Sequence, residues 1–408
     1  MSEPYLVKPD RDFLHCVLKN GGGDLKKCYQ CATCSVVCEL SGERNPFPRK
    51  EMIWAQWGLK DRLVADPDVW LCHQCNDCST HCPRGARPGD VMATIRRQTI
   101  IHYAVPGFLG KWVNDPKFAP LVLLIPTVLV GLLFLSRIEN TLGEKIIFSY
   151  YNLLPHWVLI GFFAFFSLLS VAAMTAGVVR FWQAMKAADA REETTTAAKG
   201  LGSSIVSVLR SVILHDKFTL CTTDRSRALS HLCVFYGFIA LLLVTFWVMT
   251  ARFNPLIRHD FVYPFSFWSP WRMLANLGGV AMAAGCLLII LDRWTKNRRD
   301  GTSTYFDWAF VGTLLAVVLT GFVCEVLHYV RLEPHRFVAY FIHLVFVFTL
   351  LMYLPYCKFA HVFYRITAMV YAEYSGRSGP AGVAVAGKQP EGEQEEKEGK
   401  DEESAGHA

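Results

Sequence analysis

The stretch CYQCATCSVVC, residues 28–38, sets four cysteines at C-x2-C-x2-C-x3-C spacing, and the same spacing returns in CHQCNDCSTHCP, residues 72–83. Three cysteines at such short intervals can hold three corners of an iron–sulfur cube, while the fourth reaches the neighbouring cube. The spacing therefore predicts two [4Fe–4S] clusters. One takes Cys28, Cys31, Cys34 and Cys82, and the other takes Cys72, Cys75, Cys78 and Cys38.

Structural zinc is the alternative for paired C-x2-C runs. A zinc site needs four ligands, and it gives no reason for the third cysteine at the same short interval in both runs. Pro83 follows the second run, as is usual in two-cluster ferredoxins, whereas Glu39 follows the first. That departure removes no ligand, so the iron–sulfur interpretation is preferred.

The rest of the chain has the composition of a membrane protein. Of 408 residues 52% are hydrophobic and 19% charged, against about 25% charged in soluble domains. The net charge of +6, without a basic stripe carrying interleaved aromatic residues, argues against a nucleic-acid partner. Spans of ~20 apolar residues can cross a bilayer. We predict six, at residues 118–136, 153–182, 229–251, 271–291, 305–330 and 337–363.

These features predict an all-α protein in three parts. Residues 1–105 form a helical two-cluster ferredoxin domain, with helices in PFPRKEMIWAQWG (46–58) and PGDVMATIRRQTIIHY (88–103). Residues 106–370 form a six-helix cytochrome b bundle, and the acidic tail 371–408 is expected to be disordered. Lys and Arg are concentrated in loops 183–228 and 292–304. The positive-inside rule then places the cluster domain and both termini on the cytoplasmic side of the inner membrane.

Histidines in the predicted spans suggest haem. His343 and His361 are 18 residues apart in the last predicted span. In one continuous helix they would share a face and lie about 27 Å apart along the axis. That arrangement suits two stacked b haems. His231, which opens the third span, matches His361 in depth. The second ligand of the outer haem stays open between His156, which we favour slightly, and His328.

Glu325 is an acidic residue inside the fifth predicted span, three residues before His328. Ionisable groups at membrane depth are costly and often functional. Glu325 would accept a proton from a quinol during its oxidation. The alternative is an ion pair with Arg331 or with a neighbouring helix.

Taken together, the residues resemble known electron-transfer subunits. Residues 28–92 resemble the C subunit of heterodisulfide reductases, an α-helical ferredoxin. RALSHLCVFYGF (227–238) and the last span resemble the haem b subunits of membrane heterodisulfide reductase and of nitrate reductase (gamma subunit). In that gamma subunit, histidines matching His343, His361 and His231 bind haem. A fourth histidine has no counterpart, because IALLLVT (239–245) stands in its place.

The fusion of both halves is similar to the C subunit of the quinone-interacting membrane-bound oxidoreductase complex of sulfate reducers. That resemblance implies menaquinol as electron donor, partner subunits with flavin and iron–sulfur centres, and adenylylsulfate reductase as the eventual acceptor. A subunit of a membrane heterodisulfide reductase-type complex is the alternative within the class. A transporter or signalling membrane protein with a zinc-binding head is the alternative from another class.

Overall fold

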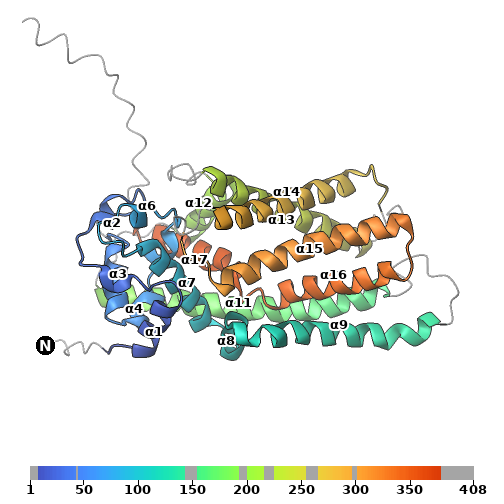
Figure 1. The fold of residues 1–408 in the computed structure, drawn as a ribbon, viewed down its shortest axis with the longest axis horizontal. Coiled ribbons are helices and arrows are strands. Elements are labelled where there is room, and N and C mark those ends of the chain that lie inside the picture. The colour runs from blue at the N-terminus through green and yellow to red at the C-terminus, as the bar shows by residue number, and fades with distance from the viewer. Residues whose placement is uncertain are drawn as a thin grey trace, which may run out of the picture.

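The computed structural model describes residues 8–42, 45–142, 154–192, 200–215, 225–253, 265–295 and 301–377. Every regular element in these ranges is a helix, which confirms the predicted all-α class. Figure 1 shows a compact head next to a bundle of long, roughly parallel helices. The head is N-terminal, and the bundle begins after it.

The head consists of short helices around one long helix, α7. The two helices predicted here are confirmed as α3 (Arg49–Gln56) and α7 (Pro88–Tyr103). Pro88 fits the first turn of α7 because its missing N–H has no intrahelical partner there. The other head helices are α1 (Arg11–Lys19), η1 (Leu25–Lys27), α2 (Thr33–Val36), α4 (Lys60–Val64), α5 (Asp68–Leu71) and α6 (Asp77–Thr80). Side chains such as Val17, Met52 and Ile95 are fully buried between them.

Two short elements, α8 (Gly107–Asn114) and η2 (Pro116–Phe118), lead from the head into the bundle. Six helices there are long and apolar enough to cross a membrane, as predicted. They are α9 (Ala119–Leu142), α11 (His156–Glu192), α13 (Arg225–Phe253), α14 (Pro270–Thr295), α15 (Tyr305–Val330) and α16 (His335–Met352). Only 6% to 33% of the most apolar window of each helix is buried inside the protein, which leaves much of their surface available to lipid.

The long helices pack in the order α13, α14, α15, α16, and α16 also contacts α9 and α11. Helices α13 and α14 approach closely at Gly237 and Gly278. A Cβ atom at Gly237 would lie 2.6 Å from the Gly278 carbonyl oxygen. Small residues at a crossing let two membrane helices approach in this way.

The last predicted span is wrong in one respect, because the structure breaks it. α16 ends at Met352, and the chain then passes through Pro355 and η4 (Lys358–Ala360) to α17 (His361–Tyr374). Proline disfavours helical conformation in the residue before it and cannot donate its own helical hydrogen bond. His343 and His361 therefore lie on different helices, and the 27 Å separation expected from one helix does not apply. α17 also continues past the predicted tail boundary at residue 371, while residues 378–408 lie outside the described ranges.

The predicted loop 183–228 contains a further helix, α12 (Leu201–Leu214). It packs on α17, with Val208 buried against Met369 and Val370. α12 and α17 lie between the bundle and the head (Figure 1).

Candidate iron–sulfur and haem sites

The two cysteine runs share one local fold. In the first, Gln30 and Ala32 have left-handed φ angles of 65° and 69°, and α2 begins at the next residue. In the second, Gln74 and Asn76 have φ angles of 56° and 69°, and α6 begins at the next residue. Left-handed φ angles cost energy for residues other than glycine. Their repetition at matching positions indicates that the two loops have the same backbone shape, and that in each loop this shape brings the cysteine side chains together.

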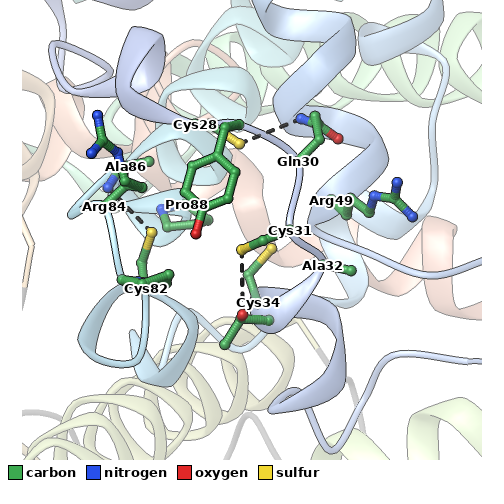
Figure 2. A pocket seen from close by; sticks show the side chains of 13 residues that line it. Cys28, Gln30, Cys31, Ala32, Cys34, Arg49, Cys82, Arg84, Ala86 and Pro88 are labelled. Atoms are coloured by element: carbon green, nitrogen blue, oxygen red, sulfur yellow. Dashed lines mark hydrogen bonds between the residues drawn. The ribbon is translucent and has the colours of Figure 1, made fainter.

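The first predicted ligand set is brought together. Cys28, Cys31, Cys34 and Cys82 line one pocket (Figure 2). Burial raises the pKa of the Cys34 thiol to about 11, and Cys28, Cys31 and Cys82 act in the same direction. A metal that binds thiolates must therefore displace protons from this set.

The second predicted set is also brought together. Burial raises the pKa of the Cys38 thiol to about 12, with Cys72 and Cys75 acting in the same direction. Burial is also the main cause that raises the pKa of the Cys78 thiol, and Cys72 and Cys75 raise it further. Cys38 thus lies close enough to Cys72 and Cys75 to interact with them, which is compatible with the crossed assignment.

Donors to sulfur accompany these cysteines. The Gln30 side-chain amide lies 3.4 Å from Cys28 Sγ, and the backbone N–H of Gln74 donates to Cys72 Sγ at 3.3 Å. The N–H of Ala86 donates to Cys82 Sγ at 3.3 Å. Hydrogen bonds to sulfur are among the features that set a cluster's reduction potential. Sequence reasoning missed these donors, although a glutamine precedes the second cysteine of both runs.

The second cysteine set lies on the membrane side of the head. The Cys72 carbonyl accepts hydrogen bonds from Arg96 of α7 and, at 3.4 Å, from Arg365 of α17. Trp70 stacks on Tyr364 of α17 at 5.4 Å between ring centroids. α17 begins at His361, so these contacts connect the second set to one predicted haem ligand.

His361 is held in one tautomer. Its Nδ1 lies 2.6 Å from the Lys358 carbonyl oxygen, which can only accept, so Nδ1 carries the proton. The lone pair of Nε2 is then available to a metal. Burial lowers the pKa of His361 to about 3, which keeps the ring neutral, and the charges of Lys358, His231 and Arg365 act in the same direction. The charge of His231, on α13, thus acts on His361, and the His215 ring lies 5.7 Å from the His231 ring.

His343, in α16, has the same tautomer for a different reason. Its Nδ1 lies 3.0 Å from the Thr320 hydroxyl of α15. That hydroxyl donates to the Ala316 carbonyl at 2.6 Å, so it accepts from His343. Nε2 again keeps its lone pair. The ring lies against Gly321, where a Cβ atom would be 3.3 Å from Cε1. A fixed Nδ1–H donor is typical of histidines that bind metals.

The second ligand of the outer haem stays open between the two predicted histidines. His156 is the first residue of α11, and its side chain lies outside the described residues. His328 lies eight residues after Thr320 on α15. That spacing corresponds to about 12 Å along the axis and ~80° around it, so His328 does not share the face that His343 contacts.

Glu325 has a partner on a neighbouring helix, one of the two alternatives considered for it. Its Oε1 accepts from Arg272 Nε at 2.9 Å and from Asn276 Nδ2 at 3.2 Å, both on α14. The Arg272 guanidinium also lies over the Tyr329 ring. These contacts tie Glu325 of α15 to α14.

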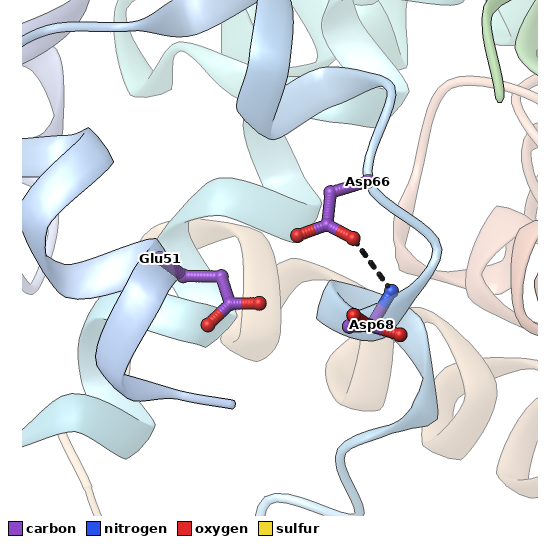
Figure 3. Close-up of side chains that lie close together, drawn as sticks. All are labelled: Glu51, Asp66 and Asp68. Atoms are coloured by element: carbon purple, nitrogen blue, oxygen red, sulfur yellow. Dashed lines mark hydrogen bonds between the residues drawn. The ribbon is translucent and has the colours of Figure 1, made fainter. Parts of the chain in front are cut away.

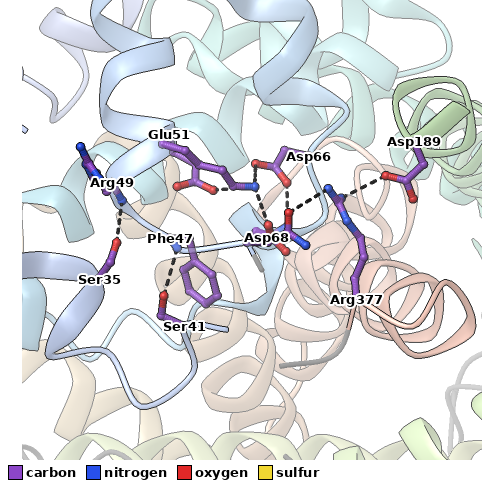
Figure 4. A network of polar contacts seen from close by, with 11 residues as sticks. Ser35, Ser41, Phe47, Arg49, Glu51, Asp66, Asp68, Asp189 and Arg377 are labelled. Carbon is purple, nitrogen blue, oxygen red and sulfur yellow. Dashed lines mark hydrogen bonds and ion pairs between the residues drawn. The ribbon is translucent and has the colours of Figure 1, made fainter. Parts of the chain in front are cut away.

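A buried acidic cluster lies elsewhere in the head. Glu51, Asp66 and Asp68 converge (Figure 3), and their carboxylate oxygens lie within 4.8 Å of one another. Such a group could hold a cation, but the Lys50 ammonium already contacts all three, at 2.5 to 3.3 Å. Figure 4 shows Arg377 next to this cluster, and its guanidinium pairs with Asp189 of α11 at 3.4 Å. The network joins the head to the C-terminal end of the described chain.

Comparisons with known proteins divide the chain in the same two parts. The family model "4Fe-4S dicluster domain" matches residues 24–86, which include the eight cysteines of the two runs. The head is 37% identical over 110 residues to the C subunit of the H(2):CoB-CoM heterodisulfide,ferredoxin reductase of Methanothermobacter marburgensis, covering 25% of this chain and 59% of that protein. It is 36% identical over 91 residues to a protein of Archaeoglobus profundus that is named as similar to the C subunit of heterodisulfide reductase, covering 22% and 48%. The dicluster match favours iron–sulfur over zinc.

The membrane part matches a second family model, "Citrate utilization protein B", over residues 117–382. The citrate utilization protein B of Escherichia coli is 28% identical over 342 residues, covering 77% of this chain and 84% of that protein. No solved structure gives a significant match. Because the family model covers more than half of the sequence, the chain belongs to the citrate utilization protein B family and carries an N-terminal 4Fe–4S dicluster domain like that of heterodisulfide reductase C subunits.

Proposed function

We propose that the chain is the membrane electron-transfer subunit of a quinone-linked oxidoreductase complex. One observation carries the proposal. The Cys72 carbonyl bonds to Arg365, which lies one helical turn after His361 on the same face of α17. A cysteine set of the head therefore neighbours a buried, neutral histidine at the end of the membrane bundle. Electron transfer between soluble and membrane centres needs such a junction.

Two [4Fe–4S] clusters and two b haems, when bound, would supply a series of one-electron carriers. Cys28, Cys31, Cys34 and Cys82 would hold the first cluster, and Cys72, Cys75, Cys78 and Cys38 the second. His361 and His231 would ligate the inner haem. His343 would ligate the outer haem, together with His156 or His328. Lys358 and Thr320 fix the rings of His361 and His343 by accepting from Nδ1.

On the quinone side, Glu325 is the candidate proton acceptor during oxidation of menaquinol. Its bonds to Arg272 and Asn276 hold the carboxyl group in one orientation. Accepting a proton would weaken the pair with Arg272, so proton uptake would be coupled to a local rearrangement between α14 and α15.

We further propose that the head and both termini face the cytoplasm and that the six spans lie in the inner membrane. Two relatives of the head are named as C subunits of larger reductases, which supports soluble partner subunits for this chain. Following the resemblance to the quinone-interacting complex of sulfate reducers, these partners carry flavin and iron–sulfur centres and pass electrons towards adenylylsulfate reductase. A heterodisulfide reductase-type complex would use the same carriers with another partner.

A second candidate function is favoured by the family match over residues 117–382. The Escherichia coli relative is named for citrate utilization. A partner that oxidises citrate or a related polycarboxylic acid would send electrons in the opposite direction, from the head to the quinone. The two candidates differ in partner and direction and require the same centres in this chain.

The test begins with the chain purified without oxygen in detergent. We expect haem b bands after dithionite reduction and two interacting [4Fe–4S] signals in electron paramagnetic resonance spectra. Menadiol, a soluble menaquinol analogue, should reduce the haem. A colourless protein would rule out the proposal and favour the zinc-headed transporter or signalling protein. Co-purified partners would then be assayed with adenylylsulfate and with citrate to separate the two candidates.

A further inference from the structure

The two cysteine sets differ in their exposure at the surface of the head. The second set lies against α7 and α17, and Cys72 and Cys78 are buried. The first set reaches the surface, where Cys31 is exposed. Two apolar side chains stand beside it, Tyr29 with 59% and Val36 with 82% of its surface exposed. The first set is therefore the one that an external protein can approach.

The rim of this first set is basic. Arg49 and Arg84 line the pocket, and no carboxylate is among its described lining residues. Figure 2 shows the two arginines on opposite sides of the cysteines. The Arg84 guanidinium lies over the Tyr29 ring, 5.8 Å from its centroid. Asp24, a carboxylate shortly before the run, is engaged by Lys27 at 2.6 Å.

We propose that this rim, formed by Tyr29, Val36, Arg49 and Arg84, docks an acidic one-electron carrier protein. The proposal rests on the proposed function and adds the electron-exchange face and the charge of the partner. Tyrosine and arginine are enriched among residues that dominate binding energy at interfaces. A basic rim steers an acidic partner towards the exposed cluster and raises the association rate. One electron would leave the first cluster, and the acceptor would gain it, with no proton required.

The experiment uses the full chain in detergent, reduced with dithionite and freed of excess reductant. Two soluble haem proteins serve as acceptors, the acidic cytochrome b5 and the basic cytochrome c, and stopped-flow absorbance follows their reduction. The tested variant is Arg49→Glu with Arg84→Glu. The control, Lys8→Glu with Lys19→Glu, changes the net charge equally at exposed residues at or beside α1, which is well separated from α2 (Figure 1).

At low ionic strength we expect the rim variant to slow cytochrome b5 reduction about tenfold and to speed cytochrome c reduction, each relative to wild type. The control should leave both rates within about twofold. Equal effects of both variants, or unchanged rates in the rim variant while both cluster signals persist, would overturn the inference. Absence of cluster signals from the wild-type chain would instead overturn the proposed function.

The acidic segment EGEQEEKEGKDEE, residues 391–403 of the same chain, is a rival occupant of the rim. A chain ending after Arg377 tests it. If the rim is open to a partner protein, truncation leaves the cytochrome b5 rate unchanged. A several-fold faster rate after truncation would assign the rim to the tail and overturn docking of a partner as its main role.

Discussion

Replacing Lys50 by methionine should destabilise the head strongly, and by an amount that depends on pH. Lys50 Nζ lies 2.9 Å from Asp66, 2.5 Å from Asp68 and 3.3 Å from Glu51. The three carboxyl side chains are at most 3% exposed. Methionine keeps the length of the side chain but removes the charge that these carboxyls share. Breaking a buried ion pair by removing one partner costs about 3–5 kcal/mol.

The pKa shifts give the pH dependence. Burial raises the pKa of Glu51 well above its usual value, which favours the protonated form of this carboxyl. Burial alone would also raise the pKa of Asp66, but Lys50, with smaller contributions from Arg377 and Glu51, lowers that pKa below its usual value. Without Lys50, Asp66 becomes a group with a raised folded-state pKa. Its contribution is then favourable only below the unfolded pKa of about 3.9 and is lost as pH rises.

The size of the loss in stability follows from the free energy needed to protonate one group, Asp66. Protonating Asp66 at pH 7, about three units above its unfolded pKa, costs about 4 kcal/mol, and at pH 5 about 1.5 kcal/mol. The variant should therefore lose about 4 kcal/mol of unfolding free energy at pH 7 and regain about 1.4 kcal/mol for each unit of acidification. Small domains are stable by only about 5–15 kcal/mol, so we expect the head of this variant to be only marginally stable at neutral pH.

Urea unfolding of the detergent-solubilised chain, followed by loss of cluster absorbance, measures this effect at pH 5 and pH 7. Lys8→Met, at an exposed position, is the control. The double variant Lys50→Met with Asp66→Asn should recover most of the loss at pH 7. A loss below about 1 kcal/mol, or an equal loss at both pH values, would show that Lys50 does not neutralise this cluster.

Three further predictions concern the cofactor sites. Cys38→Ser and Cys82→Ser should each alter the paramagnetic signal of a different cluster, and alteration of the same cluster by both would refute the crossed assignment. His231→Ala and His361→Ala should each abolish the same haem band, so a variant that keeps both haems would disprove the pairing. Thr320→Val should retain both haems but shift the reduction potential of one, because the Nδ1–H of His343 loses a hydrogen-bond acceptor worth about 1 kcal/mol. Unchanged potentials in a redox titration would refute this role.

The sequence predicted features that depend on local patterns. The sequence predicts α7 over its full length, because Asp90 in the first turn and the composition of residues 88–103 act within one segment. The six spans follow from apolar runs, while the crossed cysteine sets stay a prediction from the repeated spacing. The sequence does not predict the α12 helix, because the Lys and Arg residues of segment 183–228 indicate a loop. Thr320 could not be found from sequence, since its contact with His343 joins two different helices.

The break at Pro355 has the largest consequence, because it determines how the two halves of the chain meet. The apolar composition of residues 337–363 continues across this proline, so composition alone predicted one span. After the break, α17 packs against α5 and α7 of the head and against α11 and α12. Tyr364 thereby stacks on Trp70, and Arg365 reaches the Cys72 carbonyl. In an uninterrupted helix, the direction of α16 would set the position of His361. The separate helix instead lets one segment contact the head while its first residue stays near His231, which makes α17 the structural link between the cysteine sets and the membrane bundle.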